Sequence, residues 1–181
     1  LGANVTILER SNERMRFLDE YFHGRANIVY SNADTLEKAI TTSDLVIGSV
    51  LIPGASAPKL LTKDMLPKMI PGSVFVDIAI DQGGCAETSK PTTHDEPTYI
   101  VDNVVHYCVA NMPGAVPLTS ALALNHSVLP YALKLANQGW EKALADDPNF
   151  KNGLNVCQGK ITHKAVAEAL DLEFKEHLLA A

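Results

Sequence analysis

The sequence predicts an α/β fold, built on a doubly wound parallel sheet with helices on both faces. Over roughly the first hundred residues, short apolar runs alternate with helical patterns, which is the order of elements in a parallel sheet. The runs are continuously apolar, as in strands that are buried on both faces. With 181 residues, 46% of them hydrophobic and 20% charged, the chain is long enough for a sizeable core and too apolar to be disordered.

The first two elements are a strand and a helix. A β-branched, apolar run predicts a strand over residues 3–8. Ser11 is then placed to cap a helix over residues 12–23. The spacing of the apolar residues predicts one apolar face on this helix, made by Met15, Leu18 and Phe22.

The same alternation continues toward the middle of the chain. A short strand over residues 28–30 precedes a helix that Asp34 caps and that runs through Ile40. A helix is also predicted over residues 62–69, and Pro67 makes its end hard to place. Apolar runs bounded by turn residues predict three further strands, over residues 44–50, 73–79 and 104–110.

The last third of the chain is mostly helical in pattern. Residues 117–145 carry apolar positions at helical spacing, and Pro130 predicts a kink or a break into two helices. Thr162 is expected to cap a last helix through Leu170. The buried face of the long helical segment is predicted to consist of Leu122, Leu129, Leu133, Ala136 and Trp140.

Composition argues against several classes of protein. The net charge of −6 and the isoelectric point near 5.4 argue against nucleic acid as a partner. We expect no membrane partner, because no apolar run is long enough to cross a bilayer, and no secretory signal opens the chain. Three scattered cysteines favour a reducing, cytoplasmic setting. No histidine has a second ligand at metal spacing, so no metal site is predicted.

In a parallel sheet, ligands bind beyond the carboxyl ends of the strands. Glu9 follows the first strand, where dinucleotide-binding folds place the acidic residue that bonds a ribose. The alternative is an ordinary solvated carboxylate. The ribose-binding position lies about 20 residues beyond a glycine-rich turn, whereas only eight residues precede Glu9. We therefore expect this sequence to lack that turn and the strand before it.

Residues 76–85 carry the densest polar chemistry of the chain. Asp77 and Asp81 lie four positions apart in an apolar frame, next to Gly83 and Gly84. A carboxylate here could bond a cofactor ribose or steer an ammonium group. The alternative is a turn that Asp81 caps and in which the glycines adopt positive φ angles.

A second polar turn is expected after the strand over residues 104–110. Met112 could pack on a flat aromatic ring while Asn111 bonds an amide. The alternative is a plain strand followed by a proline turn.

Several segments together resemble the alanine dehydrogenases, within the wider family that they share with the NAD-binding subunit of proton-translocating transhydrogenase. Transhydrogenase subunits carry a Gln-Asn-type sequence where this chain has Asp81-Gln82, so alanine dehydrogenase is the closer match. The segments that carry the resemblance are residues 1–6, 44–54, 57–60, 71–85, 89–93 and 107–117.

The resemblance implies two parts. Residues 1–116 would form a Rossmann-like NAD-binding domain without its first strand and glycine-rich turn. Residues 117–181 would supply the interdomain helix and the C-terminal part of the substrate domain. Glu9 keeps the charge of the commoner Asp at the ribose position, and with it the preference for NAD over NADP.

The resemblance also implies roles for individual residues. Some would bind the adenosine end of NAD, some would form the walls of its site, and some would lie near the nicotinamide. Asp81 would belong to the catalytic site as well. The family's catalytic His, and the Lys and Arg that bind the substrate carboxylate, lie in an N-terminal domain and are not in this chain. The residues implied to bind NAD are Glu9, Arg14, Ser31, Val50, Leu51, Ile78, Asp81, Asn111, Met112 and Pro113.

The implied function is an NAD-dependent oxidoreductase that deaminates L-alanine reversibly to pyruvate and ammonia, with hydride transfer to NAD. Members of the family form homohexamers, so a homo-oligomer is expected. The alternative is the NAD-binding module of a transhydrogenase-like subunit without catalysis of its own. In either case we expect these 181 residues alone to bind NAD poorly and to turn over no alanine.

Overall fold

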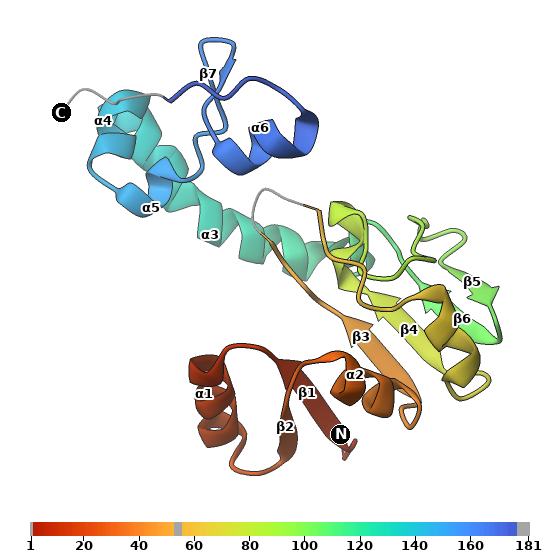
Figure 1. Cartoon of the computed structure of the whole chain (residues 1–181). Coiled ribbons are helices and arrows are strands. Elements are labelled where there is room, and N and C mark those ends of the chain that lie inside the picture. Colours follow the sequence, from red (N-terminus) through yellow and green to blue (C-terminus); the bar gives the residue numbers. More distant parts are fainter. Residues whose placement is uncertain (1, 53–55, 177–181) are drawn as a thin grey trace.

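The structure is a computed structural model that describes residues 2–52 and 56–176. Its elements form three groups (Figure 1). A two-stranded sheet with two helices comes first, a four-stranded sheet follows, and the long helix α3 leads from there to a C-terminal lobe. Helices and parallel strand pairs alternate through the first two groups, which confirms the predicted α/β class.

The first sheet pairs two parallel strands, with Glu9 at the end of one opposite Tyr30 at the end of the other. The connecting helix α1 (Asn12–Phe22) begins as predicted, since the Ser11 side chain accepts a hydrogen bond from the backbone N–H of Arg14 at 3.2 Å. Its predicted apolar stripe is confirmed as the half-buried face of the helix. The two strands are β1 (Val5–Glu9) and β2 (Ala26–Tyr30).

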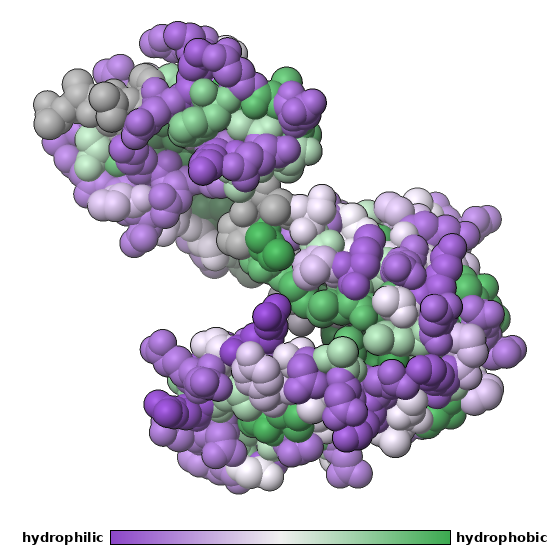
Figure 2. Space-filling model, viewed as in Figure 1, coloured by the Kyte–Doolittle hydropathy of each residue, from purple (hydrophilic) through white to green (hydrophobic). Residues whose placement is uncertain are grey.

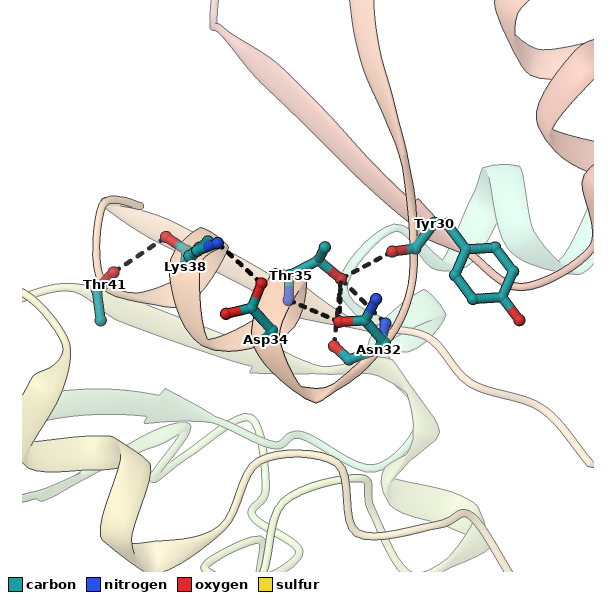
Figure 3. Close-up of polar contacts among 6 residues, drawn as sticks. All are labelled: Tyr30, Asn32, Asp34, Thr35, Lys38 and Thr41. Atoms are coloured by element: carbon teal, nitrogen blue, oxygen red, sulfur yellow. Dashed lines mark hydrogen bonds and ion pairs between the residues drawn. The ribbon is translucent and has the colours of Figure 1, made fainter.

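Helix α2 (Ala33–Ile40) is capped by Asn32, so the expectation that Asp34 caps it was wrong (Figure 3). Asn32 Oδ1 accepts from the backbone N–H of Thr35 at 2.9 Å, and Thr35 Oγ1 accepts from the backbone N–H of Asn32 at 3.0 Å. This reciprocal pair satisfies two N–H groups of the first turn at once. Asp34 lies inside that turn and pairs with Lys38 at 2.8 Å instead.

Three strands of the second sheet are parallel, as predicted, and each ends earlier than expected. The fourth, which the sequence prediction lacked, runs antiparallel along the edge. A tight turn at Asp102 and Asn103, with φ angles of 49° and 63°, creates it. Asn and Asp tolerate this left-handed conformation, which suits a two-residue hairpin. The order in this sheet is β3 (Leu45–Gly48), β4 (Val74–Asp77), β6 (Val104–Tyr107) and β5 (Thr98–Val101).

The core lies against the four-stranded sheet, where Leu66, Phe75 and Val104 are almost completely buried. The predicted helix over residues 62–69 is a 3-10 helix, η1 (Lys63–Lys68), with Pro67 inside it. Among the described residues, no strand pairing joins β1–β2 to the four-stranded sheet.

Helix α3 (Pro117–Gln138) runs through Pro130. Of the two outcomes predicted at this proline, a kink or a break into two helices, the break is therefore wrong. Proline removes one hydrogen bond of the helix, whereas Gly139, with φ of 77° and ψ of 158°, leaves the helical region altogether. The chain therefore breaks at Gly139, and α4 (Trp140–Ala145) follows.

The predicted buried face of α3 is also wrong, because no residue of this helix is buried. Leu122, Leu129 and Leu133 are each about half exposed. Figure 2 shows hydrophobic residues gathered in the middle of one face of the molecule, around the region where α3 passes the four-stranded sheet.

The C-terminal lobe is small. Thr162 does not cap the last helix, because its Oγ1 donates to the carbonyl of Leu154 at 2.7 Å. His163 occupies the N-cap position and makes no capping bond through its side chain. The elements after α4 are α5 (Pro148–Lys151), β7 (Val156–Cys157), β8 (Lys160–Ile161) and α6 (Lys164–Leu170).

Candidate functional site

The predicted site residues lie in two groups at the carboxyl ends of parallel strands. Glu9 is the last residue of β1 and Ser31 follows β2, and Arg14 is on the helix that begins just after Glu9. The other seven follow β3, β4 and β6. The ends of β3 and β4 are in register, since Gly48 lies opposite Asp77, and β6 ends opposite Val76, one residue earlier. Parallel pairing places the ends of β1 and β2 at one sheet edge and the ends of β3, β4 and β6 at another. No hydrogen bond within the described residues links the two groups.

Glu9 has one carboxylate oxygen fixed and one available. Its Oε1 accepts from the backbone N–H groups of Ser11 at 2.9 Å and Arg10 at 2.6 Å. These two bonds, that of Ser11 first, hold the pKa of the Glu9 carboxyl below its ordinary value. Within the described chain, Oε2 has no hydrogen-bond partner. The local backbone therefore fixes a charged acceptor at the end of β1.

The other two residues of this group lie beside Glu9. The backbone N–H of Ser31 donates to the Glu9 carbonyl at 2.9 Å, which fixes Ser31 at the same edge. The Arg14 guanidinium lies over the Phe17 ring, 4.6 Å from its centroid, and adds a smaller lowering of the Glu9 pKa.

The turn after β4 is organised by Asp77, so the cap proposed in the alternative interpretation, Asp81, is wrong. Asp77 is fully buried. Its Oδ1 accepts from the backbone N–H of Ala79 at 3.0 Å, which starts the 3-10 helix η2 (Ile78–Gln82). Its Oδ2 accepts from the backbone N–H of Cys85 at 2.9 Å and from Ser89 Oγ at 2.5 Å. Asp81 is consequently left exposed in the middle of this turn.

The glycines of the turn behave as predicted. Gly83 and Gly84 have φ angles of 88° and 75°, a region that side chains disfavour. Lys59 Nζ donates to both of their carbonyls, at 2.5 and 2.8 Å. A Cβ added to Gly84 would lie 2.6 Å from Asp77 Oδ2. The turn is thus packed tightly against the carboxylate that organises it.

Apolar side chains surround these strand ends. Leu51 and Ile78 are both more than half exposed, and Val50 is half-buried. Exposed apolar side chains beside charged ones are typical of a small-molecule site. Strand β3 packs closely on the turn after β4, because a Cβ on Gly48 would lie 2.1 Å from the sulfur of Cys85.

The last three site residues form a second turn, after β6. Asn111 has φ of 57° and starts the 3-10 helix η3 (Met112–Ala115). Its carbonyl lies 3.1 Å from His94 Nε2, and its side chain is exposed. An open groove of about 610 Å³ runs from Asn111 and Pro113 along the first turns of α3.

Two buried groups near the site have structural roles. Burial, and next the Asp77 charge, raise the pKa of the Cys85 thiol to about 12, which makes the thiol unreactive near neutral pH. His106 is fully buried, lies 2.8 Å from Thr88 Oγ1 and stacks on Tyr99. It is a packed side chain of strand β6.

Sequence reasoning missed Lys59 and Ser89. Each contacts the turn after β4 from outside it, and Lys59 bonds residues 24 and 25 positions away. No spacing rule covers such contacts. Within residues 2–52 and 56–176, no cluster of His, Cys, Asp and Glu has the geometry of a metal site. In the same ranges, none of the helices combines the length and the hydropathy that crossing a bilayer requires.

A family model and the curated relatives of this chain point to the same protein family. Residues 1–164 match the family described as "Alanine dehydrogenase/PNT, C-terminal domain". The chain is 62% identical to the alanine dehydrogenase of Halomonas elongata and 56% identical to alanine dehydrogenase 2 of Staphylococcus aureus. Each match covers 97% of this chain and 47% of the relative. The chain thus spans about half the length of the curated relatives it matches.

Comparison with solved structures points to the same family. An L-alanine dehydrogenase matches with a TM-score of 0.80 and 49% identity, over 94% of this chain and 47% of that protein. A transhydrogenase from Sinorhizobium meliloti matches with a TM-score of 0.57 and 28% identity, over 67% of this chain and 35% of that protein. The chain therefore belongs to the alanine dehydrogenase/PNT C-terminal domain family.

Proposed function

We propose that this chain is the cofactor-binding half of an alanine dehydrogenase, which interconverts L-alanine with pyruvate and ammonia in the cytoplasm. The observation that carries the proposal is the 62% identity to the Halomonas elongata alanine dehydrogenase, sustained over 97% of the chain. The exposed Asp81, on a turn that neighbouring residues fix, is the chemical feature that supports it.

Family membership makes this an NAD-binding domain, and the strand ends fit the adenosine part of NAD. The free oxygen of Glu9 is a suitable acceptor for ribose hydroxyls, because the other oxygen is already held by two backbone N–H groups. The negative charge of Glu9 would repel a 2′-phosphate, which favours NAD over NADP. We place Ser31 and Arg14 at the same end of the cofactor.

The second group of residues suits the nicotinamide end. Val50, Leu51 and Ile78 form walls that exclude water from one side of a flat ring. Asn111, Met112 and Pro113 close that end, with the Asn111 amide exposed for hydrogen bonding. When bound, NAD supplies the carbon that accepts a hydride from the substrate Cα.

Asp81 is the residue to which we assign a direct part in the reaction. Loss of a hydride leaves the substrate nitrogen as a positively charged imine. A carboxylate fixed beside that nitrogen stabilises the charge as it develops. Proton transfer and the binding of the alanine carboxylate are assigned to residues of the family's N-terminal domain, as the resemblance implies.

We also propose that residues 1–116 form the NAD-binding domain and residues 117–181 connect it to a substrate domain. Exposure of apolar residues all along α3 supports the presence of a further protein surface there. A homo-oligomer, a hexamer as in the resemblance, would supply part of that surface. The expected ligands are small molecules, with no nucleic acid or membrane partner.

The test is an assay of the full-length gene product for L-alanine-dependent reduction of NAD. We expect NADH to accumulate with alanine, and Asp81→Asn to lower kcat by roughly 10²-fold, as for loss of one preorganised electrostatic group. Glu87→Gln is the matched control, since Glu87 is an exposed carboxylate in the same region that accepts from the backbone N–H of Lys63.

The second candidate is a transhydrogenase-like module, which the structural match of lower TM-score favours. It predicts NAD binding without any alanine-dependent reduction. Full-length protein that binds NAD but produces no NADH with alanine would therefore replace the first proposal with this one.

A further inference from the structure

Asp77 is a buried carboxylate that the proposed reaction does not use. Its side chain is completely shielded from solvent, and none of the ion pairs in the described chain includes it. A buried charge is costly unless hydrogen bonds compensate it. The compensation here is nearly complete, because Asp77 accepts two backbone N–H groups and a hydroxyl, with the Cys85 sulfur 3.5 Å from Oδ1.

The donors come from both ends of one short turn. Ala79 lies two residues after Asp77, Cys85 lies at the far end of the turn, and Ser89 lies in the loop beyond it. One carboxylate therefore ties the beginning of the turn to its end. Lys59 holds the outer side through the carbonyls of Gly83 and Gly84.

Asp81 lies between these two tied points. Its own side chain is exposed and makes no hydrogen bond within the described residues. Its position is therefore set by the backbone of η2, which in turn depends on the bond from Ala79 to Asp77. A group that must stabilise a developing charge has to be held within a fraction of an ångström.

We propose that Asp77 is a positioning residue, whose buried carboxylate holds the turn over residues 78–85 so that Asp81 is presented to the reacting substrate. This inference rests on the proposed function, because it gives Asp77 a role in catalysis that acts only through Asp81. Asp77 itself does not touch substrate or cofactor.

The informative variant is Asp77→Asn, which keeps the shape of the side chain. An amide carries one oxygen and one NH₂ group, so its NH₂ must face the N–H of either Ala79 or Cys85. One of these two hydrogen bonds to residue 77 is lost, and the NH₂ group then faces a backbone N–H group, which is also a donor.

The experiment is a double-mutant cycle in the full-length protein, with Asp77→Asn, Asp81→Asn and the pair. We expect Asp77→Asn alone to lower kcat for alanine at least about tenfold, and to lower it less than about threefold further in the Asp81→Asn background. Glu87→Gln, the matched carboxylate-to-amide change, should leave kcat unchanged in both backgrounds.

A purely structural role for Asp77 predicts a different result. General loosening of the fold would lower activity by the same factor whether or not Asp81 is present, and equal factors would overturn the inference. A wild-type kcat in Asp77→Asn would overturn it as well.

Ser89→Ala provides a milder variant if Asp77→Asn does not fold. It removes one bond to Oδ2 and leaves the carboxylate in place. A loss of kcat of about two- to fivefold that disappears in the Asp81→Asn background supports the inference, and a loss that persists there overturns it. Failure of the proposed function is a separate result, because then the wild-type protein itself would reduce no NAD with alanine.

Discussion

The four-stranded sheet and helix α3 are both strongly apolar, but they differ in how much of their apolar surface is buried. In the sheet, Phe75 and Val104 are almost fully buried against the 3-10 helix η1 and the strands beside them. In α3, no residue is buried along its whole length. An apolar pattern therefore identifies a surface that is stable when covered. Whether it is covered depends on what else the chain brings to it.

The largest expected effect concerns the covered region. Phe75→Ala should lower the free energy of unfolding by about 3–5 kcal/mol, since it removes a ring from a closed core. Ile100→Ala, on the exposed edge strand β5, should cost less than about 1 kcal/mol. Urea unfolding of both variants measures the difference. Equal losses would contradict the core described for the sheet.

A second test separates close packing from backbone conformation. Gly84→Ala should cost more than about 2 kcal/mol, because it adds both the strain of positive φ and contacts below 3.0 Å. Gly72→Ala has a similar φ of 84° and open space around it, so about 1 kcal/mol is expected. Thermal unfolding compares the pair. A larger loss at Gly72 would show that the turn after β4 is not tightly packed.

A third test asks what covers α3. In the full-length protein, Leu122→Asp combined with Leu129→Asp should weaken self-association at least about tenfold, or about 1.4 kcal/mol. Helix content should stay constant, because both positions are exposed within the chain. Sedimentation and circular dichroism give the two readouts, with Ile100→Asp as the exposed control. An unchanged mass would show that α3 is not an interface between copies.

The smallest expected effect is a pH dependence at Glu9. Backbone bonds from Ser11 and then Arg10 lower the pKa of the folded carboxyl below its ordinary value near 4.5. Their contribution to stability is therefore complete above about pH 4.5 and is lost as the pH falls through the lower, folded pKa. Glu9→Gln should flatten this acid dependence slightly. Unfolding curves of the two proteins across acidic pH provide the measurement, and parallel curves would contradict the bonding described for Glu9.

Local sequence signals predicted much of the N-terminal half correctly. Ser11 as the cap of α1, its apolar stripe, and Gly83 and Gly84 in a turn were each predictable, because each depends on residues within a few positions. Asp34 was the wrong cap for α2, since Asn32 forms a reciprocal bond with Thr35 that is almost as local. Where two neighbouring polar residues could each cap a helix, the backbone geometry decides which of them does.

The positions of the candidate site residues were predictable in part, whereas their binding and catalytic roles stay predictions. The sequence indicated that polar residues would follow the strands, and the structure places all ten at strand ends or in the turns and helix that follow them. It gave no indication that Asp77 organises the turn and leaves Asp81 exposed. Asp77 and Asp81 look alike in sequence, and only the burial of one of them separates their roles.

The sequence by itself determined the α/β class, the parallel strands and the family. The hydrophobic period, the turn residues and the motifs that indicate them are properties of short segments. The tertiary structure alone decided the antiparallel edge strand, the tie from Lys59 to the glycine turn, and the exposure of α3. The tie from Lys59 joins residues 24 and 25 positions apart, and the exposure of α3 depends on which other surfaces reach it. The edge strand is more local, because it depends on the left-handed turn at Asp102 and Asn103. A helix can carry an apolar face in its sequence, but burial requires a second surface that lies in reach.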